Sequence, residues 1–215
     1  MVNAKIRAMR AKLLTRKQYE ALCSQSQPLP EIESTAEAVA RLRKYIVDAK
    51  ARRLISLDDD YIKAWTFIRR LPDGQNRKAL MMIKGSEIDL QNIKQLWRLK
   101  QYYPAAEPYP QLIPVFYRLD KSIVAQMAES RGVAEFIVAL RHSYYKQLST
   151  DDIERAVIQE MLHLFSRVAK QYPRSMAPVM SYIFAKKIEA RNLLMLKESI
   201  RYSLPPDEIM QHLIL

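Results

Sequence analysis

The sequence predicts an all-α protein. Its 215 residues include only three glycines, whereas residues that favour helices, such as leucine, alanine, lysine, arginine, methionine and glutamine, are abundant. Apolar residues recur mostly at spacings of three and four, which is the period of an amphipathic helix. No run alternates apolar and polar residues for long enough to propose a strand, so we expect no sheet.

The longest predicted helix covers residues 79–100. Ile88, Asn92 and Leu96 stand four residues apart in it and therefore share one face. The charged and polar side chains expected on its outer surface are Lys84, Glu87, Gln91, Lys94 and Arg98.

The same pattern returns one hundred residues later, in a second long helix. There Ile188, Asn192 and Leu196 form the stripe, and Glu189 takes the place of Asp89. A shared period of this kind is the mark of a duplicated structural unit. The sequence therefore predicts two related multi-helix units, a duplicated helical bundle in which each unit ends in a long helix.

Shorter helices precede the first long helix, and capping residues mark their starts. A first amphipathic helix is expected from about Asn3 to Leu14. The pairs that match a capping signal are Thr15 with Gln18, Ser34 with Glu37, and Ser56 with Asp59. Each is followed by apolar residues at helical spacing, so three further short helices are predicted.

A proline-rich stretch separates the two predicted units. Residues 103–114 contain four prolines, and proline disfavours helix continuation. We place the first unit at 1–104, the connector at 105–117 and the second unit at 118–215. The further helix starts predicted in the second unit are at Asp120, after Gly132, at Asp151 and Asp152, at Ser175 and at Pro205.

The charge of the chain is strongly basic and uneven. The formal net charge is +12, and residues 1–100 hold 21 basic and 11 acidic side chains against 14 and 12 in the remainder. Such a surplus indicates a surface that faces nucleic acid, anionic lipid or an acidic protein. The first nineteen residues resemble a transit peptide in being basic, but an amphipathic first helix explains them better.

Cysteine and hydropathy point to the cytosol. Cys23 is the only cysteine, so no internal disulfide can form and a reducing compartment is expected. No apolar run approaches the roughly 20 residues that cross a bilayer.

Residues that could carry catalysis or bind a metal are few. Glu160 and His163 form one E-x-x-H pattern, but a di-iron helix bundle needs a second one. Phosphate-binding glycine loops and a nucleophile elbow are missing from the sequence, and Cys23 has no nearby histidine to activate it. We therefore expect no catalytic residue, no cofactor and no metal.

Asn92 and Asn192 are the most informative polar residues. An amide buried between apolar neighbours costs roughly 1–3 kcal/mol unless it finds hydrogen-bond partners. Each asparagine either fixes the register of its helix against a neighbouring segment or contacts a partner directly.

The order of several motifs resembles the C subunit of V/A-type rotary ATPases, whose eukaryotic V-ATPase counterpart is the d subunit. The N-terminal matches are Asn3, Ala4, Ile6, Arg7, Leu13, Leu14 and Tyr19. The matches in and after the first long helix are Glu87, Ile88, Asp89, Asn92, Ile93, Arg98, Lys100 and Leu112-Ile113-Pro114. Asn192 and the segment Pro206-Asp207-Glu208-Ile209 match the last unit of that family.

The resemblance implies a funnel-like socket that seats the central shaft on the membrane rotor ring. Such a protein transmits torque for ATP-coupled proton or sodium transport and has no catalytic residues. It would lie in the cytoplasm against the membrane, held there by its protein partners, and would be monomeric when isolated. The family typically has three units, so this chain resembles a shortened member. The basic residues expected to face partners are Lys5, Arg7, Arg10 and Lys12.

Two other classes of function stay open. A basic helical module could bind nucleic acid, which would show as steeply salt-dependent binding to DNA or RNA. An enzyme with an unrecognised helical site would show a deep polar cleft with strongly shifted acids.

Overall fold

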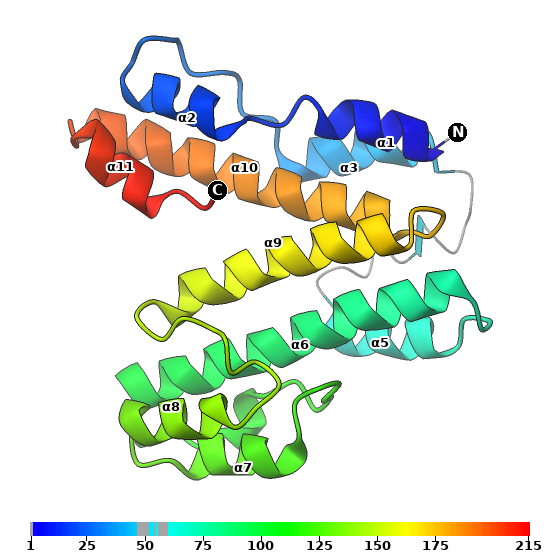
Figure 1. Ribbon diagram of the computed structural model, residues 1–215, viewed down its shortest axis with the longest axis vertical. Helices are drawn as coiled ribbons and strands as arrows, with labels where there is room; N and C mark the ends of the chain where they lie inside the picture. Colours follow the sequence, from blue (N-terminus) through cyan, green and yellow to red (C-terminus); the bar gives the residue numbers. More distant parts are fainter. Residues whose placement is uncertain (1, 47–51, 54, 56–59) are drawn as a thin grey trace. The chain divides into compact units, whose positions relative to one another are not determined.

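The computed structural model describes residues 2–46, 52–53, 55 and 60–215, and these contain helices and no strand (Figure 1). The prediction of an all-α fold is therefore confirmed. The helices are α1 Val2–Arg10, α2 Arg16–Cys23, α3 Thr35–Arg43, α5 Tyr61–Arg69, α6 Gln75–Tyr102, the short 3-10 helix η1 Tyr109–Gln111, α7 Lys121–Glu129, α8 Val133–Arg141, α9 Ile153–Gln171, α10 Ala177–Arg201 and α11 Pro206–His212.

Capping residues predicted from the sequence start four of these helices. In α2 and α3 the capping boxes are complete. The side chain of the cap residue accepts the backbone N–H of the residue three positions later, and the side chain of that residue accepts the backbone N–H of the cap. Asp120 caps α7 and Asp152 caps α9 through their carboxylates. The start predicted at Ser56 and Asp59 lies outside the described residues, and Asp60 caps α5.

The chain divides into two compact units. Unit 1 combines residues 1–55 with residues 178–215, and unit 2 is continuous from residue 56 to residue 177. These limits differ from the predicted boundaries at 104 and 118, because helices from the two ends of the chain pack together. The duplication of whole units along the sequence stays a prediction.

Unit 2 is built around α6. Its 28 residues extend for about 42 Å, and it packs against α5, α8 and α9. Ile83, Ile88 and Leu96 of α6 are completely buried, and Asn92 is 1% exposed. The predicted stripe is therefore the interior face of the helix.

Two charged residues predicted on the outer surface of α6 are buried, so that expectation is wrong for them. Lys84 has no exposed surface and Glu87 is 7% exposed. The reason is that neighbouring helices cover α6 on more than one side. The Lys84 ammonium lies 2.9 Å from the Glu87 carboxylate, and this pairing offsets part of the cost of burying both charges. Arg98 remains half exposed.

Unit 1 joins the two ends of the chain through α2, α10 and α11. Their shared core consists of Tyr19, Leu22, Cys23, Leu193, Leu196, Ile209 and Leu213. The first helix was predicted to reach Leu14, but α1 ends at Arg10. The chain turns there, and the Leu14 N–H is donated to the Glu189 carboxylate at 2.8 Å instead of to a helical carbonyl.

Candidate functional site

The sequence-predicted residues of the long helices are buried polar anchors. Asp89 accepts the backbone N–H groups of Tyr117, Arg118 and Leu119 at 2.9, 2.7 and 3.1 Å, and the Tyr145 hydroxyl at 2.9 Å. Burial raises the pKa of Asp89, and the four donated hydrogen bonds oppose that rise. Burial, followed by the neighbouring Asp89 charge, raises the pKa of Tyr145. One carboxylate thereby fixes the chain that enters α7.

Asn92 and Asn192 make the same pair of contacts, each with an isoleucine that follows it in the sequence. The Asn92 amide accepts the Ile113 N–H at 2.9 Å and donates to the Ile113 carbonyl at 3.0 Å. The Asn192 amide accepts the Ile214 N–H at 3.1 Å and donates to the Ile214 carbonyl at 2.7 Å. Both amides are therefore satisfied inside their own unit, which supports the role in fixing register over direct contact with a partner.

Replacing Asn92 by aspartate tests this role. The carboxylate would face the Ile113 and Val115 carbonyls, which now receive the amide N–H groups at 3.0 and 3.3 Å. We expect the free energy of unfolding to fall by about 2–4 kcal/mol, because the two carbonyls lose their donor and face a buried charge instead. Urea unfolding followed by circular dichroism measures the change. The exposed Gln126→Glu variant on α7 adds the same charge and should leave stability almost unchanged.

The basic residues predicted to face partners lie on α1 and just after it. Lys5, Arg7 and Lys12 are exposed and Arg10 is partly exposed. The Lys5 ammonium lies 4.2 Å from the centre of the Tyr45 ring, which ties α1 to the segment that follows α3. The Asn3 backbone belongs to α1, and its side chain lies outside the described part of the chain.

The other predicted residues stay within their own units. Arg98 on α6 contacts Glu154 on α9 at 2.8 Å, in a half-exposed ion pair that contributes little to stability. Glu87 pairs with Lys84, whose ammonium also lies 5.4 Å from the centre of the Tyr61 ring on α5. Glu87, Asp89, Asn92 and Arg98 all belong to α6.

Sequence reasoning missed the segments that these anchors hold. Neither Tyr117 nor Tyr145 was singled out, and they lie far along the chain from Asp89. Gly85, one of the three glycines of the chain, was also not singled out. An ideal Cβ built on Gly85 would lie 2.4 Å from Cγ of Tyr117, so this glycine allows the tyrosine to pack against α6. The position of a glycine inside a long helix is the signal that could have found this contact.

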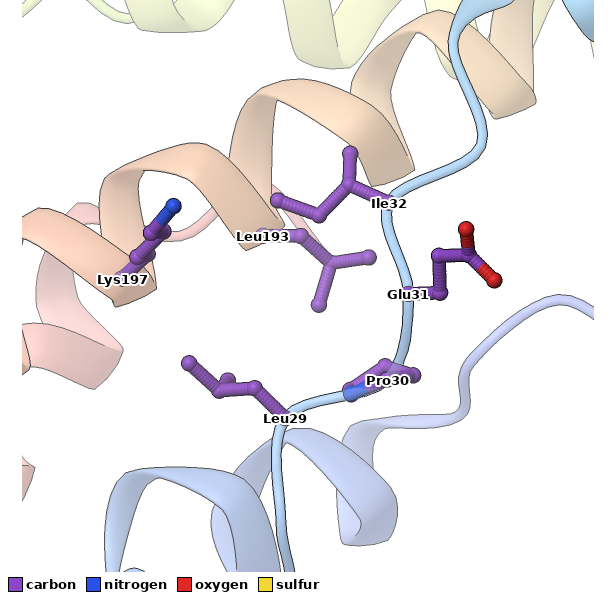
Figure 2. A pocket seen from close by; sticks show the side chains of 6 residues that line it. All are labelled: Leu29, Pro30, Glu31, Ile32, Leu193 and Lys197. Atoms are coloured by element: carbon purple, nitrogen blue, oxygen red, sulfur yellow. The ribbon is translucent and has the colours of Figure 1, made fainter.

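Unit 1 also contains a small cavity beside α10. It has a volume of about 350 Å³ and is lined by Leu29, Pro30, Glu31, Ile32, Leu193 and Lys197 (Figure 2). Figure 2 shows the segment that carries Leu29, Pro30 and Ile32 crossing α10. The lining is mostly apolar, so the cavity offers no cluster of acids or nucleophiles for chemistry.

The described residues form neither a metal-binding cluster nor a membrane-spanning helix. Within these ranges, no three His, Cys, Asp or Glu side chains come together as a metal site would require. In the same residues, no helix has both the length and the apolar character needed to span a bilayer.

The all-helical fold and its anchored long helices agree with a match to a known family. The model of the ATP synthase (C/AC39) subunit family matches residues 54–212, which is well over half of the chain. The chain therefore belongs to this family. The resemblance seen in the sequence motifs is confirmed.

Two individual relatives carry the name of the same subunit, the C subunit of an A-type ATP synthase. The chain is 29% identical over 136 residues to the C subunit of the A-type ATP synthase of Archaeoglobus fulgidus. This alignment covers 60% of this chain and 40% of the relative. It is 25% identical over 175 residues to the protein of the same name in Methanobrevibacter smithii. This second alignment covers 74% of this chain and 45% of the relative. The chain thus spans less than half the length of these curated relatives.

Proposed function

We propose that the chain is a non-catalytic central-stalk subunit of a V/A-type ATPase. It seats the central shaft on the membrane rotor ring and passes torque between them during ATP-coupled transport of protons or sodium ions. In this role it is a cytoplasmic protein that is held at the membrane by its protein partners and is monomeric when isolated. Family membership and the similarity to C subunits of A-type ATP synthases support this role.

The anchoring of α6 is the observation that carries the proposal. A part that transmits torque has to resist bending and local opening. In α6 a buried carboxylate and a buried amide, three residues apart, hold the segment from Ile113 to Leu119 against the helix by backbone hydrogen bonds. Opening this segment would leave several buried groups unpaired, each at a cost of roughly 1–3 kcal/mol. Unit 2 is therefore expected to move as a stiff body.

The basic residues of α1 and of the turn after it supply a candidate contact with a partner. Lys5, Arg7 and Lys12 are exposed, and the other exposed described side chains of residues 4–12 are alanines. A face without large exposed apolar side chains lacks the anchors that insert a helix into lipid. Charge complementarity therefore favours an acidic protein surface on the shaft or the ring.

Reversing this charge tests the contact. Changing Lys5, Arg7, Arg10 and Lys12 together to glutamate should lower the affinity for the ATPase complex by at least about tenfold, with a larger loss at low salt than at high salt. Binding of the purified variant to complex depleted of this protein measures the change at several salt concentrations.

The matched control reverses four exposed basic residues of unit 2: Lys121, Arg131, Lys146 and Arg174. This control should bind as the unchanged protein does. Equal binding by the α1 variant and the control would contradict the assignment of α1. Steeply salt-dependent binding of the unchanged protein to DNA or RNA, without binding to the ATPase, would contradict the proposed function as a whole.

A further inference from the structure

The carboxylates at positions 89 and 189 hold the same kind of chain segment. Asp89 on α6 accepts the N–H of Leu119, the residue just before the cap of α7, at 3.1 Å. Glu189 on α10 accepts the N–H of Leu14, the residue just before the cap of α2, at 2.8 Å. In both cases a leucine donates to a carboxylate on a long helix and a capped helix follows. The difference is that α7 follows α6 in the chain, whereas α2 comes long before α10.

The two helices that follow these leucines also bury the same positions. Counted from the caps Thr15 and Asp120, the fourth, seventh and eighth residues are buried in each helix. These residues are Tyr19, Leu22 and Cys23 in α2, and Val124, Met127 and Ala128 in α7. A side-chain cap at the same position, a leucine just before it and the same pattern of burial indicate that α2 and α7 are equivalent helices.

We infer that residues 14–23, which we call the N-terminal strap, complete the repeat of α10 from the opposite end of the chain. The repeat that begins with α6 continues directly through Ile113 and Leu119 into α7. The repeat that begins with α10 continues through Ile214, held by Asn192, and its next helix is supplied by the strap, held by Glu189. Unit 1 thus contains the same repeat, but a segment from earlier in the chain supplies its last helix.

Apolar packing and polar contacts both hold the strap in place. Tyr19, Leu22 and Cys23 share a buried core with residues of α10 and α11. Figure 1 shows α2 beside the end of α10 where α11 also lies, and α2 contacts α11. The Tyr19 hydroxyl hydrogen-bonds Asn192, and burial, the larger effect, raises the pKa of Tyr19 to about 12. Asn192 therefore serves the C-terminal segment and the strap together.

The segment after the strap is exposed and leaves a cavity over α10. Residues 24–31 are all exposed, and residues 29–32 line the cavity beside Leu193 (Figure 2). The strap is thus held by its own contacts with α10 and α11, and this connection adds little. Weakening the Glu189 contact should therefore make local opening of the strap more frequent.

Hydrogen exchange of the full-length protein tests this inference. In the Glu189→Ala variant, the amides of residues 14–23 should exchange at least about tenfold faster, because the strap loses a hydrogen bond to a charged group. The control is Glu198→Ala, which removes an exposed carboxylate from the same helix and should leave the strap unchanged.

A second pair of variants removes the donor and leaves α10 intact. Leu14→Pro deletes the N–H that Glu189 accepts, and Leu14→Ala removes the side chain but keeps that N–H. Leu14→Pro should speed strap exchange several-fold beyond Leu14→Ala. This pair also excludes an effect through Lys186, which Glu189 contacts as well.

Three outcomes would overturn the inference. The first is unchanged strap exchange in Glu189→Ala, and the second is equal exchange in Leu14→Pro and Leu14→Ala. The third is a dimer of the unchanged protein in solution whose strap is protected only in the dimer, since the strap would then complete a second copy. A monomer with the expected exchange supports closure within one chain. These results do not depend on binding to the ATPase.

Discussion

Replacing Asp89 by alanine is expected to lower the free energy of unfolding of unit 2 by about 3–5 kcal/mol. The variant leaves three backbone N–H groups and the Tyr145 hydroxyl without their shared acceptor in a buried site. An unsatisfied buried donor costs more than the net worth of the bond it made, so the losses at one site accumulate. Both tryptophans, Trp65 and Trp97, belong to unit 2, so urea unfolding followed by tryptophan fluorescence reports on this unit.

Two further variants sharpen the Asp89 experiment. Asp89→Asn keeps the size and one acceptor oxygen, so it should cost less than the alanine variant but still about 1–3 kcal/mol. Asp151→Ala removes an exposed carboxylate and should change stability by under about 0.5 kcal/mol. If Asp89→Ala behaves like Asp151→Ala, the carboxylate does not hold the segment from Tyr117 to Leu119.

Replacing Gly85 by alanine is expected to destabilise unit 2 by about 2–3 kcal/mol. In an exposed helix this change would stabilise by about 0.5–1 kcal/mol, because alanine favours the helix and glycine does not. Here the new Cβ would lie 2.4, 2.7 and 2.8 Å from Cγ, Cδ1 and Cβ of Tyr117. Tyr117 cannot move aside easily, because its N–H is donated to Asp89 and its ring packs edge-on against Trp65. The free-energy cost of the clash with Tyr117 therefore exceeds the gain from the higher helix propensity of alanine.

A double-mutant cycle separates the clash from other effects. In a Tyr117→Ala background, Gly85→Ala should cost far less than in the unchanged protein, since the clashing ring is gone. Gly132→Ser adds a Cβ where no atom lies within 4 Å and should be neutral or slightly stabilising at this helix start. The cycle is followed by the same fluorescence. An equal cost of Gly85→Ala in both backgrounds would contradict the packing described above.

The helices could be predicted because their signals are local. Spacings of three and four, capping pairs and prolines all act within a few residues. They located α2, α3, α7 and α9 by their caps and both long helices by their apolar stripe. The repeated asparagine was also visible, because an amide inside an apolar stripe is rare enough to draw attention.

Contacts between distant segments could not be predicted in the same way. Lys84 and Glu87 look like surface residues until the helices that cover α6 are known. Leu14 of the N-terminal strap lies 175 positions from Glu189, and no periodicity along the chain shows that pairing. The boundaries at 104 and 118 followed the repeat in the sequence, whereas packing joins the chain's two ends in unit 1.

The role as a central-stalk subunit is tested most directly by isolating the ATPase from the native host. The complex is purified through a tag on a different protein of the complex, and its composition is measured by quantitative mass spectrometry. We expect this chain in stoichiometric amount with the shaft and ring proteins, and we expect its loss when the four basic residues of α1 and the turn after it are reversed. An intact, active complex that contains none of this chain would contradict the proposed function.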